Sequence, residues 1–216
     1  MSIDKASFRK VCMKRLKDAS LRAKKSKEHK LISVLEEILH EVGAKSVLFY
    51  LPLSFEVDLR SLLKKARRKS IKCYVPFMVS ESFKMVTYRG PLKLGNFGVS
   101  EPNNSLLTIK NIDVAIVPVV GVDTDAKRIG FGKGMYDRFF SNLAEKPLTI
   151  FVQLDECICN TKITDHYDVQ ADIYLTPKSI KYRNKNVKSD SLRRWDRYRQ
   201  RSSRIFDLQK IKQRAI

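Results

Sequence analysis

The run D-V-A-I-V-P-V-V at residues 113–120 is the most apolar stretch of the chain, and it decides the predicted fold. A run of this kind is typical of a buried strand, and its proline places the end of that strand near Val117. A glycine-rich segment follows, and a helix is expected to begin near Lys133 or Gly134 and to end at Ala144. The order strand, loop, helix is the unit from which α/β proteins are built.

The rest of the chain repeats this alternation. Four further apolar runs predict strands, at residues 46–51, 72–75, 148–154 and 173–175. Helical spacing of apolar residues predicts helices at residues 4–17, 27–41 and 58–69. Pro76 is expected to end the strand that begins at Lys72, residues 83–88 to form one strand of a small hairpin, and residues 90–104 to form a loop. This alternation predicts an α/β fold: a three-layer open sheet, mainly parallel, with flanking helices.

Charge is concentrated at the two ends of the 216-residue chain. Lys and Arg total 43 against 23 Asp and Glu, which gives a net charge of +20. Residues 1–30 carry 11 basic and 3 acidic side chains, residues 178–216 carry 14 and 3, and the middle carries 18 and 17. We therefore predict one domain over residues 1–177 and a basic C-terminal extension over residues 178–216. Such ends suit an anionic partner, and composition alone does not choose among a phosphate-rich ligand, a polycarboxylate ligand, nucleic acid and an acidic membrane surface.

Composition also indicates where the protein works. No stretch approaches the roughly 18 apolar residues that a membrane-spanning helix needs, and the N-terminus is too polar for a secretory signal. The four cysteines, Cys12, Cys73, Cys157 and Cys159, lack the paired spacing of a zinc site. A cytoplasmic protein with reduced thiols and no membrane contact is expected.

The strongest local signal for chemistry is R-I-G-F-G-K-G-M-Y-D-R-F-F at residues 128–140. Its glycines let the backbone approach an anion, and the start of the following helix adds partial positive charge. Arg128, Lys133 and Arg138 add full charges, and the carboxylate of Asp137 suits Mg²⁺ beside phosphates. The spacing fits neither the Walker A loop nor the dinucleotide fingerprint. By spacing alone, a glycine-rich turn with a surface lysine remains open as the alternative.

Outside this segment the candidates are single charged residues. Glu56 follows a predicted strand and is free to face a ligand, whereas Asp58 is expected to cap the next helix. Lys5 and Arg9 lie four residues apart on one helix face that suits phosphate, although most such pairs are only solvated. Glu101 ends the glycine- and proline-rich loop, where a solvated side chain is the alternative reading.

Five motifs follow one another along the chain: K-A-S-F-R at 5–9, F-E-V-D at 55–58, F-G-V-S-E-P at 97–102, R-I-G-F-G-K-G-M-Y-D-R at 128–138 and D-V-Q-A-D-I-Y-L-T-P at 168–177. In this order they resemble the 5-formyltetrahydrofolate cyclo-ligase family, also called 5,10-methenyltetrahydrofolate synthetases. The family's patterns are K-x-x-L-R, E-V-D, F-G-I-x-E-P, R-L-G-x-G-x-G-Y-Y-D-R and D-x-x-x-D-x-x-x-T. Five matches in one order are far more specific than any single motif.

The resemblance implies an enzyme that uses ATP and Mg²⁺ to close 5-formyltetrahydrofolate to 5,10-methenyltetrahydrofolate, releasing ADP and phosphate. It implies that ATP phosphorylates the formyl oxygen, that N10 attacks the activated carbon, and that phosphate then leaves. The implied catalytic residues are Arg128, Lys133 and Tyr136. The implied nucleotide-binding residues are Lys5, Arg9, Arg128, Gly130, Phe131, Gly132, Lys133, Gly134, Met135, Tyr136 and Asp137. The implied folate contacts are Glu56, Phe97, Glu101 and Tyr136, and Asp137 is the implied Mg²⁺ ligand.

The chain departs from the family pattern at three places. Met135 stands where the family has the first of two tyrosines, and D-H-Y-D at 165–168 stands where it often has E-x-H-D. The extension after Pro177 has no counterpart, and its charge suits the polyglutamate tail of folate or RNA. Two other functions stay open: a nucleic-acid-binding protein that uses the basic ends, with Trp195 and Tyr198 stacking on bases, and another α/β enzyme with a phosphate-binding loop.

Overall fold

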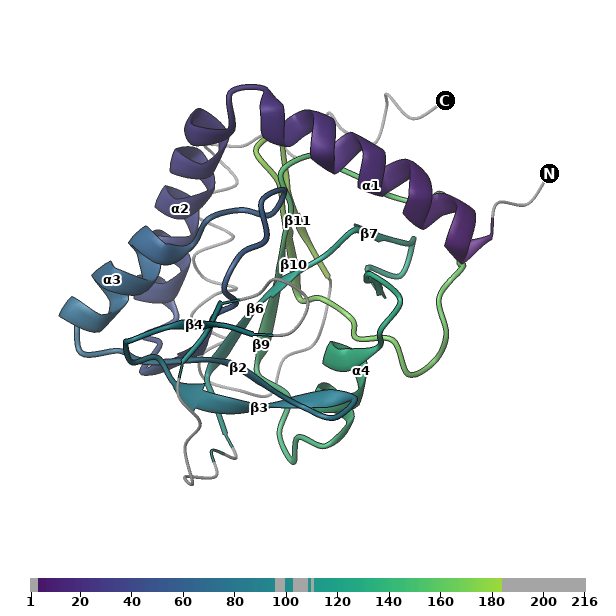
Figure 1. Cartoon of the computed structure of the whole chain (residues 1–216). Helices are drawn as coiled ribbons and strands as arrows, with labels where there is room; N and C mark the ends of the chain where they lie inside the picture. The colour runs from purple at the N-terminus through teal and green to yellow at the C-terminus, as the bar shows by residue number, and fades with distance from the viewer. Residues whose placement is uncertain (1–3, 96–99, 103–108, 110, 184–216) are drawn as a thin grey trace.

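A computed structural model describes residues 4–95, 100–102, 109 and 111–183 of the chain. Its centre is a seven-stranded sheet with the order β11-β10-β9-β6-β1-β2-β3 (Figure 1). The strands are β1 (Ser46–Leu48), β2 (Lys72–Val79), β3 (Ser82–Thr87), β6 (Val114–Pro118), β9 (Leu148–Val152), β10 (Ile173–Leu175) and β11 (Ile180–Tyr182). The hairpins β2–β3 and β10–β11 are antiparallel, and every other neighbouring pair is parallel. The mainly parallel sheet that the sequence predicts is confirmed.

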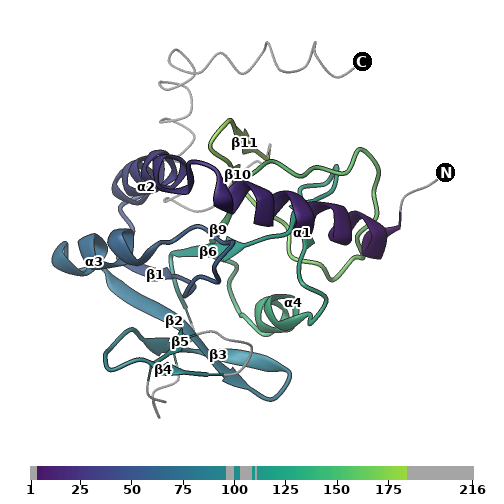
Figure 2. The same cartoon turned by 45° about the horizontal axis from the view of Figure 1, so that its top comes forward.

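The helices pack on both faces of this sheet. They are α1 (Lys5–Leu21), α2 (Lys24–Glu41), α3 (Arg60–Arg68) and α4 (Met135–Ser141). Successive side chains of β6 point to opposite faces. Ile116 joins a core with α1, α2 and α3, whereas Val117 joins a second core with Phe139 and Phe140 of α4. Helices therefore cover both sides of the sheet, which makes the predicted three layers (Figure 2).

Helix α1 is longer than its sequence pattern predicts. Asp4 caps it, because its carboxylate accepts the backbone N–H groups of Ala6 (2.8 Å) and Ser7 (2.9 Å). The apolar stripe that packs inward ends at Ala19, and the last helical residue, Leu21, is 85% exposed. The final turn therefore carries no periodic signal. The predicted end at Lys17 is wrong by one turn.

Strand β2 runs through Pro76, where the sequence predicts its end. The carbonyl of Tyr74 faces β1 and accepts the N–H of Phe49 (2.8 Å). Two residues further on, the nitrogen of Pro76 points to the same side, but the register of β1 with β2 ends at Leu48 opposite Tyr74. No hydrogen bond is lost there, so β2 continues beside β3 to Val79.

Two smaller pairs of strands and the last strand complete the fold. β4 (Lys93–Leu94) pairs with β5 (Ser100–Glu101), and β7 (Gly121–Val122) pairs with β8 (Arg128–Ile129). The sheet itself continues past residue 177, because β11 pairs with β10. The division of the chain at that residue stays a prediction, and residues 184–216 of the predicted extension lie outside the described residues. Among the described helices, none has the length and apolar character needed to cross a bilayer.

The topology places a crevice at the carboxyl ends of β1 and β6. From β1 the chain passes through α3 to β2, and from β6 it passes through β7, β8 and α4 to β9 on the other side of the sheet. Adjacent parallel strands whose connections diverge leave a ligand-binding crevice beyond their carboxyl ends. Tyr50 follows β1 and Pro118 ends β6, so both lie at this position.

Candidate active site

The glycine-rich segment forms a loop between β8 and α4. Gly132 has a φ of 97°, which a residue with a side chain rarely adopts. A side chain at Gly130 would overlap the guanidinium of Arg128. These glycines therefore let the loop turn sharply while Arg128 folds back against it.

A basic cavity of about 440 Å³ opens beside this loop. It is lined by the loop, by α4, by the start of α1 and by the segment before β10, through Lys5, Arg9, Arg128, Gly130, Gly132, Lys133, Gly134, Asp137, Arg138, Ser141, Tyr167 and Asp168. Lys5 and Arg9 thus lie on the same cavity as the glycine loop, more than 120 residues away in sequence. Clustered cations and close backbone amides suit a polyphosphate.

The cations of this cavity are held by contacts from other elements. The Nε of Arg9 donates to the carbonyl of Gly130 (2.7 Å), which fixes α1 to the loop. The Nζ of Lys5 contacts Asp168 and lies 3.2 Å from Oδ2 of Asp165. Partial burial opposes the charge of Lys5, but the bonds to Asp168 and Asp165 outweigh it and raise the pKa of Lys5.

Arg128 is the most constrained cation of the site. It is 4% exposed, and its Nε donates to the carbonyl of Pro118 at the end of β6 (3.2 Å). Its Nη1 lies 3.5 Å from Oδ2 of Asp137, and its guanidinium carbon lies 4.8 Å from the ring centroid of Tyr136. A carboxylate and an aromatic face therefore stabilise this buried charge together.

An apolar cavity of about 290 Å³ lies on the other side of Arg128. Its walls come from the segment after β1, the β2–β3 hairpin and the glycine loop, through Tyr50, Leu51, Leu53, Glu56, Pro76, Met78, Phe83, Pro118, Arg128, Phe131, Lys133, Gly134, Met135 and Tyr136. The rings of Phe83 and Tyr136 meet edge to face, with centroids 4.9 Å apart. Such walls suit a flat heterocyclic ligand.

Glu56 is the one carboxyl group among the described residues of this apolar cavity. Its Oε2 accepts the backbone N–H of Leu53 (2.8 Å). Burial raises the pKa of Glu56 to about 7, although the Leu53 bond and the charges of Arg128 and Lys24 act in the opposite direction. A carboxyl group that titrates near neutrality can donate or accept a hydrogen bond to a ligand.

The two cavities share three lining residues, Arg128, Lys133 and Gly134. A ligand with phosphates in the basic cavity would therefore reach a ligand in the apolar cavity at these three residues. Burial also raises the pKa of Tyr136 well above its usual range, so its hydroxyl keeps its proton. The arrangement suits transfer of a charged group between two bound molecules.

The structure places some predicted site residues elsewhere. Phe131 and Met135, which the resemblance assigns to the nucleotide, line the apolar cavity, where Phe131 packs against Phe55 at 5.5 Å between centroids. Glu101 is buried in β5 and lines neither of the two cavities described here. Phe97 lies outside the described residues. Asp58 accepts the N–H of Arg60, the first residue of α3 (3.0 Å), but the N-cap position is Leu59 and no side chain caps the helix, so the expected cap at Asp58 is wrong.

Several lining residues escaped the reading of the sequence. Asp168 and Tyr167 belong to the basic cavity, and Tyr50, Met78 and Phe83 belong to the apolar cavity. Asp168 and Tyr167 had a signal, because Asp168 opens the D-V-Q-A-D motif and both belong to the D-H-Y-D segment that departs from the family pattern. The others are ordinary strand or loop residues that only the folded chain brings to one place.

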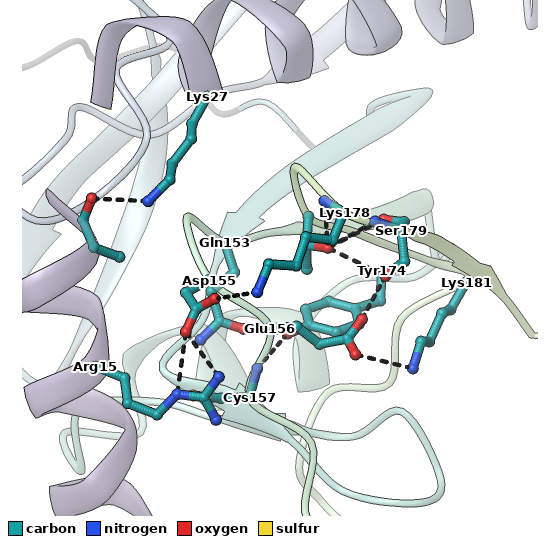
Figure 3. Close-up of polar contacts among 12 residues, drawn as sticks. Arg15, Lys27, Gln153, Asp155, Glu156, Cys157, Tyr174, Lys178, Ser179 and Lys181 are labelled. Atoms are coloured by element: carbon teal, nitrogen blue, oxygen red, sulfur yellow. Dashed lines mark hydrogen bonds and ion pairs between the residues drawn. The ribbon is translucent and has the colours of Figure 1, made fainter. Parts of the chain in front are cut away.

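Ion pairs and buried polar contacts fasten α1 and the last hairpin to the segment after β9 (Figure 3). Nη2 of Arg15 on α1 lies 2.8 Å from Oδ2 of Asp155, whose other oxygen lies 3.5 Å from Nζ of Lys178. Beneath them the buried hydroxyl of Tyr174 accepts the N–H of Cys157 (3.1 Å) and contacts Gln153. This support holds the helix that presents Lys5 and Arg9.

Several known proteins resemble the chain in sequence and fold. The chain is 24% identical over 143 residues to a 5-formyltetrahydrofolate cyclo-ligase of Haemophilus influenzae, covering 61% of this chain and 75% of the relative. It is 25% identical over 175 residues to the 5-formyltetrahydrofolate cyclo-ligase of Mycoplasma genitalium, covering 80% of this chain and 98% of that relative. The solved structure of Aquifex aeolicus 5,10-methenyltetrahydrofolate synthetase has a TM-score of 0.67 and 24% identity, covering 86% of this chain and 97% of that one, and so shares the fold. The sequence model of one family matches residues 1–177, and the chain therefore belongs to the 5-formyltetrahydrofolate cyclo-ligase family.

Proposed function

We propose that the protein uses ATP and Mg²⁺ to close 5-formyltetrahydrofolate to 5,10-methenyltetrahydrofolate, with release of ADP and phosphate. One observation carries the proposal: a basic cavity and an apolar cavity meet at Arg128, Lys133 and Gly134. The first suits a triphosphate, and the second suits a pterin with Glu56 at its polar edge. Holding both reactants at one junction removes much of the entropic barrier to their reaction.

The reaction has two steps on this arrangement. The formyl oxygen attacks the terminal phosphorus of ATP, and ADP leaves with the electrons of the broken bond. N10 then attacks the formyl carbon and gives up its proton, and phosphate leaves with the former formyl oxygen. Arg128 and Lys133, at the junction, stabilise the charge on the phosphoryl group as it passes between the cavities. Tyr136 keeps Arg128 in place through its ring face.

The carboxylates of the basic cavity fit a magnesium ion shared with the nucleotide. Mg²⁺ is usually held by one or two carboxylates together with substrate phosphates. Asp137 and Asp168 are the two carboxylates on the described cavity wall, and no cluster of three ligating side chains occurs among the described residues. Asp137 would hold the ion, with Asp168 nearest to assist. When bound, Mg²⁺ would neutralise part of the negative charge on the phosphates.

Glu56 is the side chain that we propose for recognition of the pterin. The raised pKa of Glu56 leaves both protonation states accessible near neutral pH. Its backbone partner Leu53 occupies one oxygen and leaves the other for the ligand.

The four cysteines are all buried and form no disulfide bond, as in a protein of a reducing compartment. A cytoplasmic location is therefore part of the proposal.

The experiment follows the methenyl chromophore of the product in the near ultraviolet. The full chain is mixed with 5-formyltetrahydrofolate, Mg²⁺ and ATP, and the same mixture is run without ATP. We expect absorbance to grow only when ATP is present. Lys133→Ala should lower kcat by about 100-fold or more, and Lys146→Ala, an exposed lysine just after α4, serves as the matched control. A full-length folded chain that binds ATP without forming the chromophore would overturn the proposal.

A further inference from the structure

The basic cavity is built for phosphates, but a nucleoside triphosphate also carries a flat purine base. Most described residues of that cavity are charged side chains or glycines. Neither offers the flat apolar surface on which a base gains binding energy. Tyr167 is the one aromatic side chain among the described residues that line it. Its position, rather than its chemistry alone, decides whether a base can reach it.

Tyr167 is not one of the residues at which the two cavities meet. It lines the basic cavity and not the apolar one, whereas Arg128, Lys133 and Gly134 line both. In the proposed reaction the terminal phosphate must lie at that junction to meet the folate. The base, at the other end of the nucleotide, must then lie toward a part of the basic cavity remote from it. Tyr167 meets this requirement because it lines the basic cavity and not the apolar one.

The ring of Tyr167 is both exposed and held. The residue is 60% exposed, one of a few large apolar side chains that face solvent among the described residues. Its hydroxyl donates to Oδ2 of Asp165 (3.0 Å), and its ring meets His166 edge to face at 5.1 Å between centroids. Asp165 is itself fixed, because its backbone N–H bonds Asp168 (2.7 Å) and Lys127 bonds its carbonyl (2.7 Å). Little conformational entropy is therefore lost when a ligand packs on this ring.

The guanidinium of Arg138, another flat group that lines the basic cavity, is already held by hydrogen bonds. Arg138 donates from Nε to the backbone carbonyl of Glu81 (2.8 Å) and from Nη2 to that of Lys133 (2.5 Å). These bonds tie its guanidinium to the β2–β3 turn and to the glycine loop. Tyr167 has no such second task, since its only polar bond described here is made at the tip of the ring.

From this geometry we propose that the purine base of the nucleotide packs on the ring of Tyr167, which makes this residue a determinant of nucleotide affinity. The inference rests on the proposed function, because it takes the terminal phosphate to lie at the junction. It assigns Tyr167 to binding and not to the chemical step. The hydroxyl bond to Asp165 orients the ring, and the ring face supplies the contact.

The test compares a nucleotide with its phosphates alone. Dissociation constants of Mg²⁺–ATP and of Mg²⁺–tripolyphosphate are measured by calorimetry for the full chain, for Tyr167→Leu and for Tyr167→Phe. Tyr88→Leu, an aromatic residue outside both cavities, is the matched control. We expect Tyr167→Leu to raise the dissociation constant of Mg²⁺–ATP by about 10-fold, in the range that base–aromatic stacking supplies. Tripolyphosphate should bind that variant as it binds the parent chain, and Tyr167→Phe, which keeps the ring, should restore most of the ATP affinity.

Turnover gives a second readout. Tyr167→Leu should raise KM for ATP with little change in kcat, because the contact is the same before and during the reaction. If Tyr167→Leu weakened the binding of ATP and of tripolyphosphate equally, the inference would be overturned, since Tyr167 would then act on the phosphates through Asp165 and Lys5. Unchanged ATP affinity in Tyr167→Leu would overturn it as well. A parent chain that binds neither ligand would refute the proposed function and this inference with it, and that result is distinct from the other two.

Discussion

Replacing Glu56 by glutamine should stabilise the protein at alkaline pH while it weakens folate binding. The pKa of Glu56 rises from 4.5 to about 7 in the folded chain, mainly because the group is buried. A carboxyl group with a raised pKa stabilises the fold only while it is protonated, so the free energy of unfolding falls as pH rises from about 4.5 to about 7. The shift corresponds to a cost of about 3 kcal/mol once Glu56 is ionised.

Glutamine removes this cost because it cannot ionise. Its side-chain oxygen can still accept the N–H of Leu53, which bonds Glu56 at 2.8 Å. Its amide hydrogens need partners that the carboxylate did not need, a penalty of about 1 kcal/mol that does not depend on pH. We therefore expect Glu56→Gln to be about 2 kcal/mol more stable than the parent chain at pH 8. The difference between the two chains should change by about 2.5 kcal/mol between pH 5 and pH 8.

Urea unfolding of both chains at pH 5, 6, 7 and 8 measures this difference directly. Comparing the two chains cancels the titration of all groups that do not interact with Glu56. Glu145→Gln, at an exposed glutamate after α4, is the control and should show no such trend. A constant difference between Glu56→Gln and the parent chain across this pH range would refute the reasoning. It would mean that the carboxyl group is well solvated in the folded protein.

Three further outcomes follow from the site and its support. Asp137→Ala should abolish turnover in the chromophore assay without unfolding the chain by circular dichroism, and normal activity would disprove the metal assignment. Gly132→Ala should lower the free energy of unfolding by about 1–3 kcal/mol, because alanine is strained at a φ of 97°; an unchanged urea midpoint would show that the loop relaxes. Tyr174→Phe should lower the free energy of unfolding by about 2 kcal/mol in the same urea assay, since it leaves Gln153 and the N–H of Cys157 without their buried partner. A urea midpoint equal to that of the parent chain would indicate that water replaces the hydroxyl.

Sequence patterns predicted best those elements whose burial repeats within a few residues. The inward side of α2 consists of Leu31, Leu35, Ile38 and Leu39, and this helical spacing is visible in the sequence. The five main strands were found because buried parallel strands are continuous apolar runs. The ends of elements were less certain. Pro76 looked like a terminator, and only the end of the neighbouring strand β1 explains why β2 can contain it.

The site was predictable where a motif is local and hidden where the fold assembles it. The glycine loop and Asp137 occupy one segment, so its glycines, charged residues and place before a helix suggested phosphate chemistry, although its spacing matched no standard motif. By contrast, Lys5 meets Asp168, 163 residues later in the chain. No local pattern encodes that pairing, and none indicates that Tyr167 opens onto the same cavity. The apolar walls were missed for a similar reason: Phe83 and Tyr50 look like ordinary core residues until the crevice beside β1 and β6 is seen.

The contact between Lys5 and Asp168 also bears on how the protein is made. A ribosome adds about 5–20 residues per second, so the N-terminal helix emerges on the order of 10 s before its partner carboxylate is synthesised. Phe8, Cys12 and Leu16 share a core with residues from Leu31 to Leu175, so part of the surface that buries them is also made late. Among the described residues, the wall of the basic cavity is complete only when Asp168 has been added. A chain that ends before Asp168 therefore lacks part of the wall of the basic cavity, and the proposed ATP site would be incomplete in it.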